Sequence, residues 1–141
     1  MPGMAFLNWK TDFELGIPEF DGQHKHLVAI MNRLHDEMKK GAPAHALHAI
    51  LADLINYTRT HFRDEELAMQ QSGYPRLQQH RNEHEELTAS VLRFQKDLEE
   101  GRIALSIQLL NFLKVWLRDH IQDSDRAYSP HLRSRMKTTA V

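Results

Sequence analysis

Residues 61–84 of the chain read HFRDEELAMQQSGYPRLQQHRNEH, and this stretch decides the fold. It contains two pairs of polar side chains four residues apart, His61 with Glu65 and His80 with His84, separated by a turn that contains Gly and Pro. A step of four places both members of a pair on one face of an α-helix, about 6 Å apart along its axis. The stretch therefore predicts two helices joined by a short turn, each presenting two side chains able to bind a metal.

Breakers divide the rest of the chain into helical segments of similar length. They are Gly41-Ala42-Pro43, Ser72-Gly73-Tyr74-Pro75, Glu100-Gly101 and Ser129-Pro130. Between them, apolar residues recur at steps of three and four, which is typical of helices with one buried stripe. The four segments cover about 21–40, 44–71, 77–99 and 102–121. Because connections this short force neighbouring helices to run antiparallel, we expect an all-α fold, an up-down-up-down four-helix bundle.

The two ends of the chain differ in composition. The first twenty residues contain several aromatic side chains, among them Phe6 and Trp9, and we expect residues 1–20 to form an ordered arm packed on the bundle. Residues 21–132 are expected to form the bundle domain, which closes with a short C-terminal helical turn. Residues 133–141 are basic and polar, and we expect a frayed tail there.

Composition excludes several classes of function. The chain has 141 residues, which suits one domain, with 18 Lys and Arg against 19 Asp and Glu. This balance argues against nucleic acid or an anionic membrane as the main partner. There is no cysteine, so any metal must be held by nitrogen and oxygen ligands. No signal peptide pattern or run of about 20 apolar residues is visible, and we expect a monomer in the cytoplasm.

Histidine is unusually frequent, with ten in the chain. One His-x-x-x-His pair is nearly expected by chance at this frequency, so the motif alone is weak evidence. In antiparallel helices, however, residues equally far from a turn lie at the same height. The residues that share one height, on the apolar faces, are His24, His61, Glu65, His80, His84 and His120. Because unpaired buried polar groups cost several kcal/mol, this layer predicts a metal site.

The other five histidines do not belong to this layer. His26 points to the opposite side of its helix from His24, and His35 lies about 16 Å further along the axis. His45 and His48 lie near the far turn, and His131 lies beyond the bundle. We expect surface positions or local hydrogen bonds for all five.

Four stretches of the chain resemble the hemerythrin family, in particular its single-domain bacterial members. They are Asp21-Gly-Gln-His24-Lys, His61-Phe-Arg-Asp-Glu65-Glu, His80-Arg-Asn-Glu-His84 and His120-Ile-Gln-Asp-Ser-Asp125. Trp9 in the arm and Met69-x-x-x-Gly73-Tyr74 also fit the family pattern. The resemblance covers nearly the whole chain, and no ligand position of the family is missing.

The resemblance implies a centre of two iron ions with an oxo or hydroxo bridge. The implied ligands are His80, His84 and His120 for one iron, His24 and His61 for the other, and Glu65 and Asp125 as carboxylate bridges. Dioxygen is implied to bind at the open position of the two-histidine iron.

Asp125 rests on the resemblance alone. Five residues from His120 is about 140° around a regular helix, whereas Asp123 is nearer the face of His120 and stays the alternative. The family spacing requires the helix to break or bulge just after His120, where Ser124 or Asp123 could cap a following turn.

We expect reversible dioxygen binding for storage, transport or delivery, and no enzyme activity. No Glu-x-x-His motif occurs in the last three segments, which disfavours a carboxylate-rich oxygenase or ferritin-like site. The residues expected to line a dry pocket for dioxygen are Leu27, Val28, Met31, Leu113 and Leu117. The alternatives are an oxygen or redox sensor read by a partner, a di-iron enzyme acting on peroxide or nitric oxide, and a metal-free interaction bundle.

Overall fold

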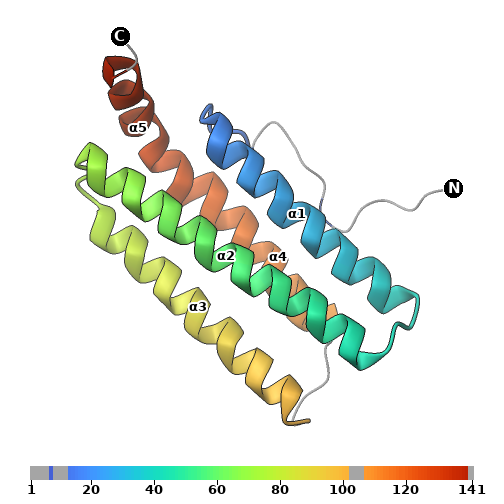
Figure 1. Ribbon diagram of the computed structural model, residues 1–141. Helices are drawn as coiled ribbons and strands as arrows, with labels where there is room; N and C mark the ends of the chain where they lie inside the picture. The colour runs from blue at the N-terminus through green and yellow to red at the C-terminus, as the bar shows by residue number, and fades with distance from the viewer. Residues whose placement is uncertain (1–6, 8–12, 102–106, 140–141) are drawn as a thin grey trace, which may run out of the picture.

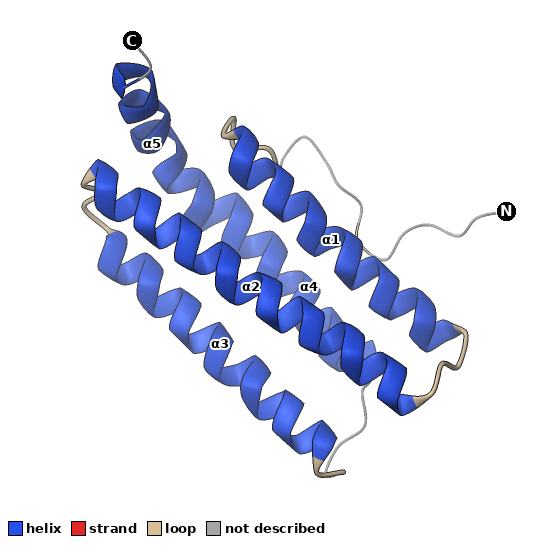
Figure 2. Cartoon of the chain, in the orientation of Figure 1, coloured by secondary structure: helices blue, strands red, loops and turns tan. Residues whose placement is uncertain are grey.

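A computed structural model describes residue 7, residues 13–101 and residues 107–139, with only the backbone described for residue 107 and residues 135–139. Long helices lie side by side and alternate in direction (Figure 1). In chain order they are α1 (Pro18–Lys39), α2 (Ala44–Ser72), α3 (Leu77–Glu99), α4 (Ile107–Asp119), the π-helical segment η2 (His120–Asp125) and α5 (Arg126–Thr139). Figure 2 shows helix over nearly all of the described chain, which contains no strand. Since α4, η2 and α5 form one continuous fourth helix, the expected antiparallel four-helix bundle is confirmed.

The turns lie where the breakers predicted them. Gly41 and Gly73 follow α1 and α2 with φ of 73° and 70°, a conformation that other residues adopt at a cost. The N–H of Tyr74 donates to the Met69 carbonyl at 2.9 Å and closes the end of α2. Helix α1 begins at Pro18, three residues earlier than expected, because the fixed φ of proline suits the first position of a helix.

The core is the apolar stripe that the spacing predicted. Its buried members include Leu27, Met31 and Leu34 of α1, Leu51, Leu54 and Met69 of α2, Leu87, Val91 and Leu98 of α3, and Leu110, Leu113 and Leu117 of α4. The side chains of residues 102–107, at the start of the fourth predicted segment, lie outside the described residues. The four stripes face one another along the bundle, and seven buried polar side chains gather at one height, where the candidate metal centre lies.

The described part of the N-terminal arm packs on the bundle. Phe13 and Leu7 are buried. The backbone N–H of Leu7 donates to Asn32 Oδ1 at 2.7 Å, and Asn32 Nδ2 donates to the Leu7 carbonyl at 2.9 Å. Phe6 and Trp9, which were expected in the same contact, lie outside the described residues.

The C-terminal end differs from the expectation. Instead of a short turn followed by a frayed tail from residue 133, helix α5 continues for 14 residues to Thr139 and passes through Pro130. Proline removes one backbone hydrogen bond but does not have to end a helix whose face is held by tertiary contacts. Leu132 is buried, and the His131 ring donates from Nε2 to the Ser72 carbonyl at 2.8 Å, so α5 stays attached to the end of α2.

Candidate metal centre

Seven polar side chains meet at one height in the apolar interior. They are His24 of α1, His61 and Glu65 of α2, His80 and His84 of α3, and His120 and Asp125 of η2. Each is at most 6% exposed. The structure thus brings together all seven residues named from the sequence, from all four helices of the bundle.

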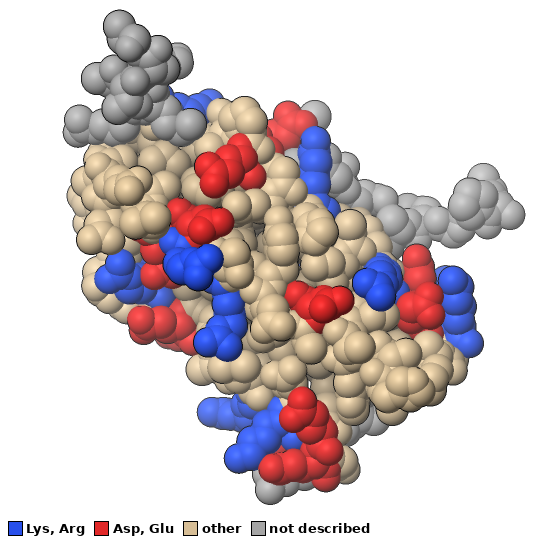
Figure 3. Space-filling model, in the orientation of Figure 1, with Lys and Arg blue, Asp and Glu red and all other residues tan. Residues whose placement is uncertain are grey.

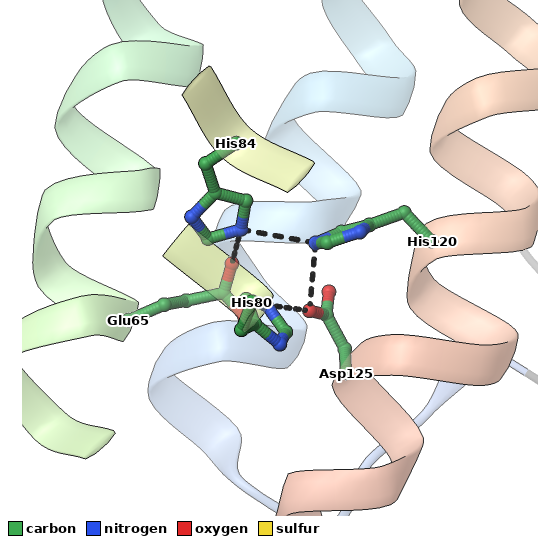
Figure 4. A group of neighbouring side chains, drawn as sticks. All are labelled: Glu65, His80, His84, His120 and Asp125. Atoms are coloured by element: carbon green, nitrogen blue, oxygen red, sulfur yellow. Dashed lines mark hydrogen bonds and ion pairs between the residues drawn. The ribbon is translucent and has the colours of Figure 1, made fainter. Parts of the chain in front are cut away.

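The seven side chains form two overlapping groups. One consists of Glu65, His80, His84, His120 and Asp125, and the other of His24, His61, Glu65 and Asp125, with the candidate ligand atoms of each group within 4.8 Å of one another. Figure 4 shows the first group, in which the three imidazoles and two carboxylates point toward a common centre. Two positions with three and two histidines therefore share two carboxylates.

The shared carboxylates face both positions. Asp125 Oδ1 lies 3.0 Å from His80 Nε2 and 3.1 Å from His120 Nε2, whereas its Oδ2 lies 3.2 Å from His24 Nε2. A carboxylate with one oxygen toward each of two positions has the arrangement of a bridging ligand.

Glu65 is shared through a single oxygen. Its Oε1 lies 2.8 Å from Nε2 of His61, a member of the two-histidine group, and 3.7 Å from Nε2 of His84 in the other group. Each of the five imidazoles directs its Nε2 atom toward a shared carboxylate or toward another imidazole. The inner surface of the site thus consists of five ring nitrogens and carboxylate oxygens.

These atoms fit a bound cation. Glu65 Oε1, both oxygens of Asp125 and His80 Nε2 are buried without a hydrogen-bond partner. Leaving such groups unpaired costs free energy, and a buried charge costs more. Imidazole nitrogen with carboxylate oxygen is a donor set that suits first-row metals such as iron.

The charges of the site depend on one another. Burial lowers the pKa of His120, but Asp125 and Glu83 outweigh burial and raise this pKa to about 10. Burial raises the pKa of Asp125, yet His120, His24 and His80 hold it well below its usual value. In the metal-free protein, protons on imidazoles therefore balance the two carboxylates, and a metal cation would take over that role.

The π-helical segment explains why Asp125 belongs to the site. In a π-helix the backbone bonds run from residue i to i+5, so residues five apart lie on nearly the same side. Asp125 therefore lies below His120 and is buried, whereas Asp123, the alternative, is exposed. The helix bulges and does not break, so Ser124 and Asp123 lie inside the continuous helix and not at the start of a new turn.

Tyr128 is a member of the site that the sequence reasoning missed. Its hydroxyl donates a short hydrogen bond to Glu65 Oε2, and the side chain is fully buried. Burial and the nearby Glu65 raise the pKa of Tyr128 well above its usual value, so the hydroxyl stays a donor. The only signal in the sequence is the step of three from Asp125, which places both on one helix face.

Aromatic rings also hold two of the histidines in place. Phe62 stacks on His84 with ring centroids 3.7 Å apart, and Trp116 stacks on His120 at 4.4 Å. Both histidines belong to the three-histidine group, whose ring orientation is therefore set by packing as well as by the carboxylates.

Next to the site lies a small apolar cavity of about 30 Å³. Leu27, Met31, Leu113 and Leu117, four of the five residues expected around a dioxygen pocket, line it. Val28 is buried in the core but is not among the lining residues. Trp116, which stacks on His120, also lines this cavity.

The five remaining histidines lie outside the candidate ligand groups. His26 and His45 are exposed, and His35 and His48 are partly buried. His131 bonds to the backbone at the end of α2. The helical phase read from the sequence thus separated the two sets of histidines correctly.

Comparisons with known proteins agree with this geometry. A family model described as the Hemerythrin HHE cation binding domain matches residues 15–132. A bacteriohemerythrin of Stenotrophomonas maltophilia is 30% identical over 97% of this chain and 88% of that protein. One of Methylococcus capsulatus is 32% identical over 92% of this chain and 98% of its own length. A crystal structure of wild-type hemerythrin superimposes with a TM-score of 0.87 at 31% identity, covering 91% of this chain and 98% of that one. The chain therefore belongs to the hemerythrin family.

Proposed function

We propose that the chain holds two iron ions and binds dioxygen reversibly, as a protein for oxygen storage, transport or delivery. The observation that supports this best is the pair of shared carboxylates: Asp125 directs one oxygen toward each histidine group, and Glu65 lies between His61 and His84. Family membership and the relatives named bacteriohemerythrin support the same assignment.

The proposed ligand roles follow from the two groups. His80, His84 and His120 would hold one iron, His24 and His61 the other, and Glu65 and Asp125 would bridge them together with an oxo or hydroxo group. The two-histidine group offers one protein ligand fewer than the other, so an iron held there would have a position left for dioxygen. Two ferrous ions, when bound, would supply two electrons to dioxygen and take them back on its release.

The residues around the ligands favour reversible binding over turnover. Five neutral imidazoles donate less charge than a carboxylate-rich set, which makes high oxidation states of iron harder to reach. The apolar cavity lined by Leu27, Met31, Leu113 and Leu117 keeps water from the site. Tyr128 holds Glu65 by donating to the oxygen that does not face His61.

One series of spectra tests the proposal. Protein expressed with ample iron should contain close to two irons per chain by metal analysis. The reduced protein should be nearly colourless, gain a charge-transfer band in air, lose it under argon and regain it in air over several cycles. An iron content of one, or irreversible oxidation in the first cycle with consumption of reductant, would contradict it, and the latter would favour the enzyme alternative.

A further inference from the structure

The Nδ1 atoms of the candidate ligand histidines point away from the shared carboxylates, and their partners differ in charge between the two groups. In the three-histidine group, His84 Nδ1 donates to Glu66 Oε2 at 2.9 Å, and His120 Nδ1 lies 3.2 Å from Glu83 Oε2. In the two-histidine group, His61 Nδ1 donates to the amide oxygen of Gln23 at 2.5 Å. Two imidazoles of one group thus face carboxylates through Nδ1, His84 by a hydrogen bond and His120 by an ion-pair contact, whereas the other group has an amide.

The other histidine of the two-histidine group, His24, lacks even an amide partner at Nδ1. Its Nδ1 is buried and has no hydrogen-bond partner among the described residues. No carboxylate therefore supports either imidazole of this group through Nδ1 in the described structure.

Two of the three outward partners, Glu66 and Gln23, are themselves fixed by a further contact. Arg81 Nε donates to Glu66 Oε1 at 3.0 Å, which leaves Oε2 for His84. The Gln23 amide nitrogen donates to Asp64 Oδ2 at 3.1 Å, so the amide oxygen is the atom turned to His61. These two partners therefore present one defined acceptor each.

These partners lie at the surface end of each imidazole. The side chain of Glu66 is 20% exposed and that of Glu83 is 34% exposed, whereas the histidines they support are nearly inaccessible. The outward partners can therefore be changed without opening the core, and Glu to Gln keeps their shape.

We infer that Glu66 and Glu83 are positioning residues that make the three-histidine position the stronger metal site, while Gln23 leaves the two-histidine position the weaker one. An imidazole whose Nδ1–H donates to a carboxylate is a better electron donor at Nε2 and is held in the correct tautomer. A neutral amide oxygen provides the orientation with less of the charge. The inference rests on the proposed two-metal function and adds an order to its two positions.

Cobalt(II) titration of the metal-free chain tests this inference without dioxygen. Visible absorption should show two steps of uptake, and after the first the NMR spectrum should show hyperfine-shifted exchangeable N–H signals from His84 and His120. A position with three histidines would bind cobalt before a position with two even without Glu66 and Glu83. The test of the carboxylate partners is therefore made with variants. Glu66→Gln and Glu83→Gln should each weaken the first step about 10- to 100-fold and remove or broaden the N–H signal of their own histidine, with the second step unchanged.

The reciprocal variant is Gln23→Glu, which gives His61 a carboxylate partner. Gln23→Glu should raise the affinity for cobalt in the second step, so that the affinities of the two steps differ less. The matched control is Glu85→Gln, which removes the same charge from an exposed position of α3 beside the same surface hollow as Glu66. It should change neither step, and circular dichroism should show that every variant keeps the helical fold.

Three outcomes would overturn the inference. The first is that Glu66→Gln and Glu83→Gln lower the cobalt affinity of both steps equally. The second is that they lower it no more than Glu85→Gln does. The third is that Gln23→Glu leaves the affinity of the second step unchanged. Uptake of a single cobalt by the unaltered chain would instead contradict the proposed two-metal function itself.

Discussion

At the scale of single residues, the candidate ligands and the other histidines differ in phase and height rather than in type. His61, His84 and His120 reach the shared carboxylates. His26 and His45 are exposed, although they lie on α1 and α2, the helices that contain His24 and His61. Burial among carboxylates, and not the presence of imidazole, makes a histidine of this chain a candidate ligand.

Replacement of the histidines one at a time should therefore divide them into two sets. His61→Ala, His84→Ala and His120→Ala should each lower the iron content well below two per chain, because each removes a nitrogen from a buried site. His26→Ala and His45→Ala should leave it unchanged. Metal analysis of the purified variants measures this, and equal iron loss in both sets would contradict the assignment.

Tyr128 should matter for the stability of the metal-free protein. Tyr128→Phe leaves a buried oxygen of Glu65 without its donor, which should lower the free energy of unfolding by about 1–3 kcal/mol. Urea denaturation measures the change. Tyr57→Phe is the matched control, since Tyr57 is only partly buried, and a similar loss in both variants would contradict a specific role for the Tyr128 hydroxyl.

The pH dependence of the metal-free protein follows from His120. Its pKa of about 10 in the folded chain lies above the ordinary 6.5, so protonation of this imidazole stabilises the folded state. The contribution is fully present below pH 6.5 and is lost as the pH rises through 10. Thermal unfolding of the metal-free protein should show this decline, and His120→Gln should reduce it. An unchanged decline in the variant would assign it to other groups.

At the scale of elements, η2 accounts for the position of Asp125. A π-helical turn contains one residue more than an α-helical turn, and this extra residue places position i+5 where position i+4 of a regular helix would lie. The same extra residue keeps the face of α5 that contains Tyr128 and Leu132 directed into the bundle.

Deletion and insertion in η2 should therefore have opposite results. Deleting Asp123, which is exposed, should convert the segment to a regular α-helix with Asp125 four residues after His120, so that iron binding is retained. Inserting one alanine after Asp123 should rotate Asp125 away from the site and reduce iron content. Metal analysis with circular dichroism separates the two, and loss of iron in the deletion variant would mean that the π geometry itself is required.

At the scale of the whole molecule, all four helices contribute residues to the site and its cavity. Figure 3 shows acidic and basic side chains interspersed over one face, as expected for a net charge of −1. No helix in the described part of the chain is long and apolar enough to cross a membrane. Under the proposed function, the apolar cavity between the helices is the feature of the whole bundle that most directly concerns dioxygen.

Opening this cavity to water should shorten the life of the oxygenated protein. Leu117→Gln places a polar group of similar size in the cavity wall, so decay to the ferric state should accelerate while the iron content stays near two. The decay of the charge-transfer band measures this. Leu67→Gln is the control, because Leu67 is 51% exposed, and equal decay in both variants would argue against a protective role of the cavity.

The sequence by itself determined the helices, their order and the height of the polar layer. Apolar spacing and distance from a turn are properties of one helix or one hairpin, so they place His24, His61 and His80 together without reference to any contact between helices. The five histidines outside the layer were separated by the same reasoning.

Only the tertiary structure decided which further side chains complete the site. Tyr128 reaches Glu65 across 63 positions of the chain. Asp125 was named from the family resemblance, but the backbone bulge that turns it into the site has no periodic signature. The outward partners Glu66 and Gln23 depend on how each helix is rotated about its own axis. Spacing shows which residues share a face, but the packing of the helices determines which atoms on two faces meet.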